Sequence, residues 1–194
     1  MQNTIRDAKR ALRNQVCAEL ARMDPGGRAA ASAGARALLV AQAIWKTARE
    51  ILFFAPLPEE VDVWPLLLEA LSAGKRVALP RFVAETRTYE ARLIRDATTD
   101  VKAGYFGIRE PASHCAQIRS SRLDLILVPG VAFDLQGHRL GRGRGYYDQL
   151  LGLMPGTTCG VAFESQIVND IPVEPHDVRL DFILTPQRWI EPKV

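Results

Sequence analysis

The sequence contains no long hydrophobic run and no evident export signal. Its longest apolar stretches, residues 51–57 and 123–128, are far shorter than the roughly 20 residues that a membrane-spanning helix needs. The N-terminal residues carry charges early and lack the apolar core and small-residue cleavage site of a secretory signal. We therefore expect a cytoplasmic protein that has no membrane partner.

Cysteine is also scarce. The three cysteines, Cys17, Cys115 and Cys159, are odd in number and far apart, and none lies in CxxC or CxxH spacing. Disulfide frameworks and zinc sites usually show closely spaced sets of cysteine and histidine. The spacing argues against both, and we expect three ordinary thiols.

Neither sign of charge dominates the composition. The chain has 25 basic and 22 acidic residues, and its formal charge of +3 does not by itself predict a nucleic-acid partner. The basic residues are nevertheless concentrated in two clusters, one formed by Arg6, Lys9, Arg10 and Arg13 and the other by Arg139, Arg142 and Arg144. Either cluster is suited to bind an anion.

The amino-acid composition is that of an ordinary globular protein. With 194 residues, of which 47% are hydrophobic and 24% charged, the chain can bury one core, so we expect a single domain over residues 1–194. Apolar residues at helical spacing predict helices over residues 4–23, 28–46 and 62–73, and a further helix beginning near Gly145. Short apolar runs predict strands over residues 51–54, 77–79, 89–94, 123–128, 160–163 and 182–184.

The order of these elements predicts the fold class. The cluster at residues 24–27 ends the first helix, Pro80 closes the second strand, and helices then alternate with strands made of continuous apolar runs. This pattern is typical of an α/β fold whose mostly parallel sheet is flanked by helices on both faces. Ligands bind beyond the carboxyl ends of such strands, which places the site in residues 55–60, 80–81, 129–147 and 164–177.

A glycine-rich string in the third of these segments is the most informative motif. Gly141, Gly143 and Gly145 alternate with Arg142 and Arg144. Glycine lets successive N–H groups point at one anion, arginine adds fixed forks for phosphate oxygens, and the helix N-terminus that follows adds a favourable dipole. The string is neither a Walker A motif nor a GxGxxG fingerprint. It predicts a phosphate cradle, with a solvated surface loop as the alternative.

The longer string PGVAFDLQGHRLGRGRGYYD, residues 129–148, resembles the signature of 5-formyltetrahydrofolate cyclo-ligases, approximately PGxxFDxxGxRLGxGxGYYD. Further elements are similar to that family in the same order, and they lie at residues 9–13, 58–62, 79–81, 107–111, 160–166, 171–177 and 180–185. The resemblance therefore covers nearly the whole chain. It implies the NagB/RpiA/CoA-transferase-like form of the α/β fold.

The resemblance also implies a reaction, the conversion of 5-formyltetrahydrofolate and MgATP into 5,10-methenyltetrahydrofolate, ADP and phosphate. The formyl oxygen attacks the γ-phosphoryl group, N10 closes the ring, and phosphate leaves. Phosphoryl transfer requires positioning and charge stabilisation rather than a covalent nucleophile. Glycine amides, arginines and Mg²⁺ would meet that requirement.

Residue roles follow from the same resemblance. Arg142 is the catalytic candidate, because its position matches the arginine that stabilises charge on the transferred phosphoryl group. The residues that would bind ATP are Lys9, Arg13, Arg139, Leu140, Gly141, Arg142, Gly143, Arg144, Gly145, Tyr146 and Tyr147. Lys9 and Arg13 share one helix face by their spacing, although such a pair taken alone is more often solvated.

The same comparison assigns metal and folate contacts. Asp148 and Asp177 match the magnesium carboxylates of the family. The residues that would bind the folate substrate are Ala55, Glu60, Phe106, Arg142 and Tyr146, with Glu60 accepting from N–H donors of the pterin. Without the resemblance, Asp148 and Glu60 are read as surface charges, Asp177 as a turn residue and Phe106 as core.

Two other functions stay open at this point. One is a non-catalytic relative that binds RNA or a phospho-ligand through its basic loop, and the other is an ATP-dependent ligase with a different acceptor. The matching residues occur together and no aromatic RNA-binding string is present, which favours catalysis. We expect small-molecule partners only, with ATP as co-substrate, no nucleic acid, and a monomer.

Overall fold

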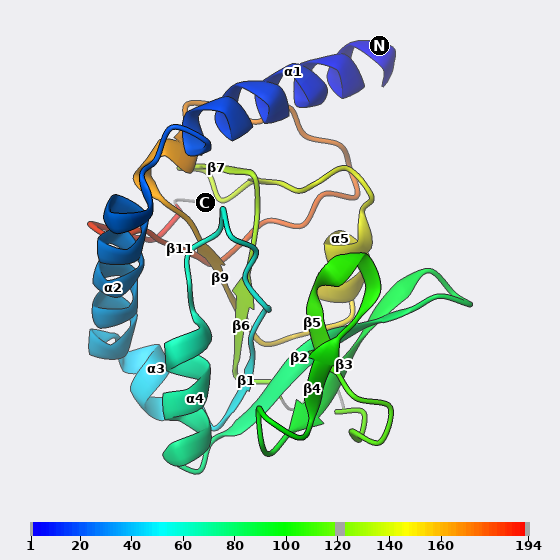
Figure 1. Cartoon of the computed structure of the whole chain (residues 1–194). Coiled ribbons are helices and arrows are strands. Elements are labelled where there is room, and N and C mark those ends of the chain that lie inside the picture. The colour runs from blue at the N-terminus through cyan, green and yellow to red at the C-terminus, as the bar shows by residue number, and fades with distance from the viewer. Residues whose placement is uncertain (1, 119–122, 193–194) are drawn as a thin grey trace.

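The computed structural model describes residues 2–118 and 123–192, which form a layered α/β structure (Figure 1). Its centre is a seven-stranded sheet with the order β12-β11-β9-β6-β1-β2-β3. The strands are β1 (Glu50–Leu52), β2 (Arg76–Val83), β3 (Thr88–Ile94), β6 (Leu125–Val128), β9 (Thr157–Val161), β11 (Phe182–Leu184) and β12 (Trp189–Ile190). The five inner strands pair in parallel, and β3 and β12 pair antiparallel at the edges. The predicted, mostly parallel sheet is confirmed.

Helices cover both faces of this sheet. The helices are α1 (Gln2–Leu20), α2 (Pro25–Ala41), α3 (Ala43–Thr47), α4 (Trp64–Ser72) and α5 (Tyr146–Leu151). In Figure 1, α2, α3 and α4 lie on one side of the sheet, α5 lies on the other, and α1 crosses above the upper end of β6. None of the described helices is long and apolar enough to span a membrane.

Side chains alternate between the two faces along each strand, as strand geometry requires. In β6, Leu125 and Leu127 pack into the core beneath α2 and α4, whereas Ile126 and Val128 pack into the core beneath α5. All four side chains are fully buried. A strand covered on both faces needs no polar positions, which explains the continuous apolar run in the sequence.

The segment at residues 24–27 ends α1 as predicted, but it also begins the next helix. The side chain of Asp24 accepts a hydrogen bond from the backbone N–H of Gly27, and Pro25 occupies the first turn of α2. The expected single helix over residues 28–46 is in fact two helices. Gln42 has extended backbone angles and separates α2 from α3.

The expected end of the second strand at Pro80 is wrong. The strand β2 continues through Pro80 to Val83 and returns as β3 in an antiparallel hairpin. The register of β2 with β1 ends at Ala78, so Pro80 lies where β3 is the pairing neighbour. Proline is tolerated at such a position because no ladder bond to β1 is lost.

Small sheets occupy segments that the sequence analysis left as loops. The strands β7 (Ala132–Asp134), β8 (Arg139–Leu140) and β10 (Ile167–Val168) form one small sheet, and β4 (Val101–Ala103) pairs with β5 (Arg109–Pro111) in another. The 3₁₀ turns η1 (Tyr105–Gly107) and η3 (Glu164–Gln166) precede β5 and β10. Buried Asp134 shapes the β7–β8 turn by accepting from the backbone N–H groups of Gln136 and His138.

Gly160 in β9 provides a test of this packing. A Cβ atom there would lie 2.6 Å from Cε1 of Phe133 and 2.9 Å from Cδ1 of Leu180, and both neighbours are buried. We expect Gly160→Ala to lower the free energy of unfolding in urea by about 1–3 kcal/mol through overpacking. Gly152→Ala is the control, since a Cβ there meets only ordinary contacts. Equal stability of the two variants would contradict the close packing around Phe133.

Candidate active site

The strand order changes direction at β1, which creates the place where such sheets bind ligands. From β1 the chain proceeds to β2 on one side and to β6 on the other, so the loops after β1 and β6 separate. A cleft of about 1320 Å³ opens there. Single drug-sized ligands occupy pockets of roughly 300–1,000 Å³, so this cleft has room for two ligands. It lies in the region that the sequence predicted.

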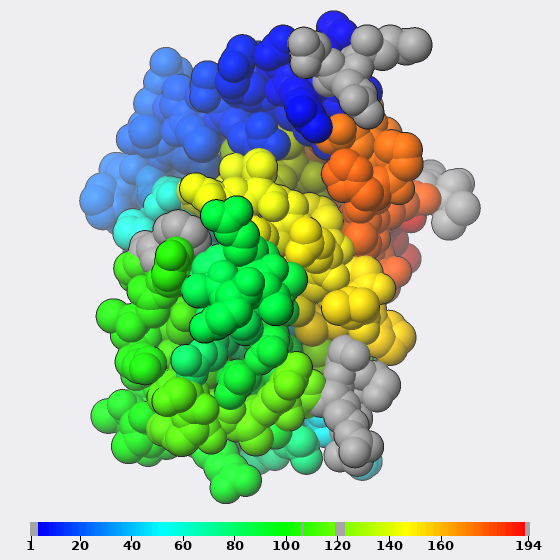
Figure 2. Space-filling view, turned by 90° about the vertical axis from the view of Figure 1, so that its right-hand side faces the viewer, coloured from blue at the N-terminus to red at the C-terminus, as the bar shows by residue number. Residues whose placement is uncertain are grey.

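The cleft gathers side chains from distant parts of the chain. Figure 2 shows the face on which α1 (blue) meets the yellow segment that leads into α5 and the orange segment near residue 170. The predicted site residues that line the cleft are Lys9, Arg13, Ala55, Glu60, Arg139, Leu140, Gly141, Arg142, Gly143, Arg144, Gly145, Tyr146, Tyr147, Asp148 and Asp177. Phe106 belongs to η1, but its side chain lies outside the described residues. The roles assigned to all of these residues remain predictions.

Helix α1 contributes two cations that hold two loops of the cleft. The ammonium group of Lys9 lies 2.6 Å from a carboxylate oxygen of Asp177 and 2.9 Å from one of Glu174. One turn later, Nε of Arg13 donates to the carbonyl of Gly141 at 2.8 Å. The two basic side chains therefore connect α1 to both the segment 174–177 and the glycine-rich loop.

The ion pair of Lys9 is well shielded, with 8% of its side chain and 12% of that of Asp177 exposed. Burial alone would raise the pKa of Asp177, but the hydrogen bonds from Lys9 and from the backbone of Glu174 lower it below its usual value. Lys9 also remains protonated, because the same carboxylates outweigh its burial and raise its pKa. The pair is therefore fully charged at neutral pH.

This pair predicts a pH-dependent stability difference. Because the folded-state pKa of Asp177 is depressed, the pair stabilises the fold above the ordinary carboxylate pKa and loses that contribution as pH falls through the lower folded value. We expect Lys9→Met to lower the free energy of unfolding by about 1–3 kcal/mol at neutral pH, since it leaves Asp177 without its cation.

The difference from the wild type should shrink as pH falls below about 4, the ordinary carboxylate pKa, toward the lower folded pKa of Asp177. Urea unfolding at several pH values measures it. Arg10→Met is the matched control on the same helix, because its ion pair with Asp7 is largely exposed and should contribute little. A difference that stays constant with pH would contradict the assigned role of the Lys9–Asp177 pair.

The glycine-rich loop connects β8 to α5 and takes backbone conformations that favour glycine. Gly143 has φ +93° and Gly145, the N-cap of α5, has φ +69°. The predicted start of a helix near Gly145 is confirmed, but α5 has only six residues. Because the helix is short, the predicted binding of phosphate would depend on the amides and arginines of this loop.

Arg139 lies beneath the loop and is 3% exposed in its side chain. Its Nη2 donates to Oδ1 of Asp148 at 2.7 Å, and its guanidinium carbon lies 5.7 Å from the ring centroid of Tyr147. Its Nε is buried without a hydrogen-bond partner among the described residues. Arg139, the predicted phosphate ligand, is thus bonded to Asp148, the predicted metal ligand, and fixes its position.

Arg142 extends across the cleft from the glycine-rich loop to the loop after β1. Its Nη2 lies 2.8 Å from Oε1 of Glu59 and 3.2 Å from Oε1 of Glu60. Half of the Arg142 side chain is exposed, whereas that of Glu60 is 10% exposed. Burial raises the pKa of Glu60, although the backbone N–H of Leu57 and the guanidinium of Arg142 oppose that shift. Arg142, which was predicted to contact both substrates, and Glu60, which was predicted to contact folate, are therefore direct partners.

An aromatic wall faces these charges. The ring of Tyr89 lies 5.8 Å from that of Tyr146 and 5.7 Å from that of Tyr147, and Phe82 lies 5.2 Å from Tyr146. Burial raises the pKa of Tyr147 well above its ordinary value, so the phenol stays neutral. The hairpin β2–β3 and the helix α5 thus form together an aromatic cluster of tilted and edge-to-face rings near the buried carboxylate Glu60.

Comparison with known proteins decides the family. The model of the 5-formyltetrahydrofolate cyclo-ligase family matches residues 5–186, which is nearly the whole chain. The chain belongs to this family. As a member of the cyclo-ligase family, it is an enzyme.

Individual relatives agree over most of their length. The 5-formyltetrahydrofolate cyclo-ligase of Mus musculus is 29% identical over 197 aligned residues, which cover 93% of this chain and 95% of that protein. The cyclo-ligase of Escherichia coli K12 is 32% identical over 145 residues, which cover 73% of this chain and 80% of that protein. The chain is thus similar to cyclo-ligases of both an animal and a bacterium.

Solved structures share the fold. The NMR structure of Aquifex aeolicus 5,10-methenyltetrahydrofolate synthetase has a TM-score of 0.86 and 30% identity, covering 96% of this chain and 93% of that chain. A 5,10-methenyltetrahydrofolate synthetase from Mycoplasma pneumoniae has a TM-score of 0.72 at 22% identity, covering 92% and 98%, which shows a common fold. The fold of this cyclo-ligase family member is therefore that of methenyltetrahydrofolate synthetases.

Several residues of the site were not predicted from the sequence. Among them, Glu174 binds Lys9, Glu59 binds Arg142, and Tyr89 and Glu110 line the cleft. Burial raises the pKa of Glu110, partly offset by hydrogen bonds from the backbone of Tyr105 and Phe82. Glu59 and Glu174 could have been found from the sequence, because they lie close to Glu60 and Asp177 in the chain. Tyr89 could not, because its place in the cleft depends on the antiparallel β2–β3 hairpin, which was not predicted.

Two carboxylates of the cleft are ligands of the kind that the predicted magnesium ion would need. Asp148 and Asp177 both line it, and hard oxygen ligands are those that Mg²⁺ prefers. Oδ2 of Asp177 bonds Lys9, but its Oδ1 lies 3.8 Å from the nearest nitrogen of His176, beyond hydrogen-bond distance. His176 itself is 68% exposed on its loop, as expected. The donor set is thus compatible with an ion that also binds phosphate oxygens and water.

Proposed function

We propose that this enzyme uses MgATP to cyclise 5-formyltetrahydrofolate to 5,10-methenyltetrahydrofolate, with release of ADP and phosphate. One observation carries the proposal together with family membership. Arg142 joins the glycine-rich loop, a surface suited to phosphates, to Glu60, a buried acid suited to N–H donors. The two halves of the cleft therefore meet at the residue that stabilises the transferred group.

The proposed reaction has two steps. The formyl oxygen forms a bond to the γ-phosphorus of ATP while the bond from phosphorus to the leaving oxygen of ADP breaks. N10 then attacks the formyl carbon and loses its proton, the carbon–oxygen bond breaks, and phosphate leaves with the formyl oxygen. The first step moves negative charge between oxygens around phosphorus, so the protein must supply fixed positive charge rather than a nucleophile.

The cations of the cleft supply that charge in the proposal. Amides of the loop 141–145 and the guanidinium of Arg142 point to the triphosphate, with Arg142 on the phosphoryl group in transfer. Lys9 and Arg13 hold the loops of the nucleotide side in place and contribute charge to the same region. Bound Mg²⁺, held by Asp148 and Asp177, would neutralise phosphate oxygens and orient them.

The folate lies on the opposite side of Arg142 in this proposal. The pterin packs against the edge-to-face pair Tyr89 and Tyr146, and its N–H donors bond the carboxylate of Glu60. Ala55, which also lines the cleft, completes the proposed folate contacts. A role for Phe106, the monomeric state and the cytoplasmic location remain predictions from the sequence.

The direct test follows product formation by its near-ultraviolet absorbance. Purified protein is mixed with 5-formyltetrahydrofolate and MgATP, with reactions lacking ATP and reactions lacking folate as controls. Absorbance of methenyltetrahydrofolate that rises only in the complete mixture is the expected result. Measurable ATP binding without any product would overturn the proposed acceptor and favour an ATP-dependent ligase acting on another substrate.

A further inference from the structure

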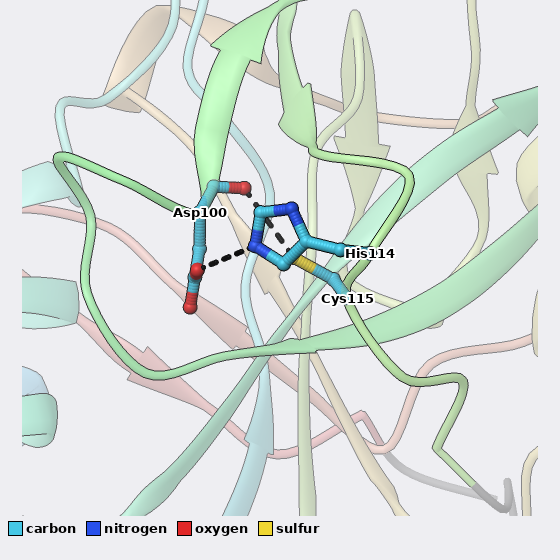
Figure 3. A group of neighbouring side chains, drawn as sticks. All are labelled: Asp100, His114 and Cys115. Carbon is cyan, nitrogen blue, oxygen red and sulfur yellow. Dashed lines mark hydrogen bonds and ion pairs between the residues drawn. The ribbon is translucent and has the colours of Figure 1, made fainter.

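A second group of metal-ligating side chains lies outside the cleft. Asp100, His114 and Cys115 come from two connections, one before β4 and one after β5, and point toward one another (Figure 3). Nε2 of His114 lies 2.9 Å from Oδ1 of Asp100, and Sγ of Cys115 lies 3.5 Å from the backbone oxygen of Asp100. One ligand atom from each residue lies within 4.8 Å of the other two. The residues that line the cleft do not include these three.

The backbone around this group is fixed by hydrogen bonds. Oδ2 of Asp100 accepts from the N–H groups of Arg95 at 2.7 Å and Asp96 at 3.2 Å, which orients Oδ1 toward His114. The N–H of Ala112 donates to the backbone oxygen of Asp100 at 2.7 Å, which ties the two connections together. Such supporting bonds are typical of the surroundings of metal ligands, where they hold the ligand in one orientation.

We propose that Asp100, His114 and Cys115 bind one zinc ion. A thiolate, an imidazole and a carboxylate form the donor set that zinc prefers, whereas Mg²⁺ and Ca²⁺ require oxygen ligands. The side chain of His114 is 64% exposed, so an ion can enter from solvent and keep water as a fourth ligand. Cys115 is 5% exposed and closes the site on the protein side.

The 2.9 Å separation of His114 and Asp100 requires only a small adjustment. Zinc lies about 2.0–2.2 Å from nitrogen and oxygen ligands and about 2.3 Å from sulfur, so the ion would replace the proton between His114 and Asp100 and widen their separation slightly. The exposed ring of His114 has room for that movement. Burial raises the pKa of the Cys115 thiol, with the nearby charges of Asp100, Arg81 and Arg92 as smaller influences, so binding must also release the thiol proton.

The position of the site indicates what the ion would do. It would join the connections on either side of the β4–β5 hairpin, and β5 carries Arg109 and Glu110 to the edge of the cleft. Binding to the folded chain alone stabilises it in proportion to the logarithm of free ion concentration. Zinc is therefore expected to raise the Tm of the protein and to make the β4–β5 hairpin more rigid.

Cobalt(II) is the probe that distinguishes this site from the carboxylates of the cleft. Metal-free, reduced protein is titrated with Co²⁺, and sulfur-to-cobalt charge-transfer absorption is followed in the near ultraviolet. We expect one equivalent of Co²⁺ to produce the band and one equivalent of Zn²⁺ to abolish it. Cys115→Ser should remove the band, and His114→Ala and Asp100→Asn should weaken binding by more than about 10-fold, the lower end for loss of a supporting group.

Matched controls keep the proposal falsifiable. Cys17→Ser removes the exposed cysteine on α1 and should leave the titration unchanged, as should His176→Ala in the cleft. Circular dichroism and urea unfolding establish that each variant is folded. Absence of the band in the wild type, or a band that survives in folded Cys115→Ser or disappears in His176→Ala, would overturn the assignment.

Discussion

Arg142→Ala is expected to reduce the kcat of methenyltetrahydrofolate formation by about 10²–10³-fold, the effect of removing one fixed donor from a developing oxyanion. Arg142 is exposed enough that its loss should not unfold the chain, because half of its side chain already contacts solvent. Steady-state kinetics followed by product absorbance measure the change, and circular dichroism checks the fold. An unchanged kcat would contradict the proposed role of this guanidinium.

Arg142→Lys separates charge from geometry. Lysine keeps the positive charge but lacks the planar fork that can bond two oxygens at once. We expect the lysine variant to recover only a small part of the lost rate. Glu59→Gln is the control, because it removes the negative charge of the 2.8 Å partner of Arg142 without changing any group proposed to touch substrate. Full activity of the lysine variant would reduce the role of Arg142 to general electrostatic attraction.

Glu60→Gln is expected to raise the KM for 5-formyltetrahydrofolate by about 10–100-fold, which corresponds to one or two charge-assisted hydrogen bonds. Glutamine has the same shape but offers one acceptor oxygen and no charge. The KM for ATP at saturating folate should change little, because Glu60 lies on the folate side of Arg142 in the proposal and is then no longer bonded to that arginine. Glu59→Gln again serves as the control, and an equal rise of both KM values would contradict the division of the cleft.

The buried state of Glu60 adds a pH dependence to this prediction. Its pKa is raised by burial, so the ionised form that accepts pterin N–H bonds is lost as pH falls through that raised value. KM for folate should therefore rise toward acid pH in the wild type and stay flatter in Glu60→Gln. The free energy of unfolding should change in the opposite direction. Burial favours the protonated form of Glu60, so the contribution of this residue to stability is lost as pH rises through its folded-state pKa.

The sequence contained enough to predict the parallel sheet and most of the cleft. Runs such as residues 125–128 are apolar at every position because both faces of β6 are covered, and the string 139–148 is contiguous, so its members remain together in any fold. The β2–β3 hairpin was missed because Pro80 usually ends a strand. Its antiparallel pairing depends on where β1 stops, and this is a tertiary feature.

Contacts between distant segments left no local pattern. Lys9 and Glu174 are 165 residues apart, and nothing in the spacing of either residue indicates that they form an ion pair. Asp100 lies 14 residues from His114, outside the short cysteine and histidine spacings by which zinc sites are recognised. The thiols were therefore expected to be ordinary, and the arrangement of Cys115 became visible only in three dimensions.

The bridge from Arg142 to Glu59 and Glu60 has a consequence for the order of events at the cleft. In the free protein these side chains satisfy one another, so a nucleotide that draws Arg142 to its phosphates also releases Glu60 to accept from a pterin. Binding of one substrate then frees the side chain that binds the other. By thermodynamic linkage, each substrate increases the binding affinity for the other by the same factor. The two substrates should bind with positive synergy, and neither dissociation constant describes the enzyme without the other.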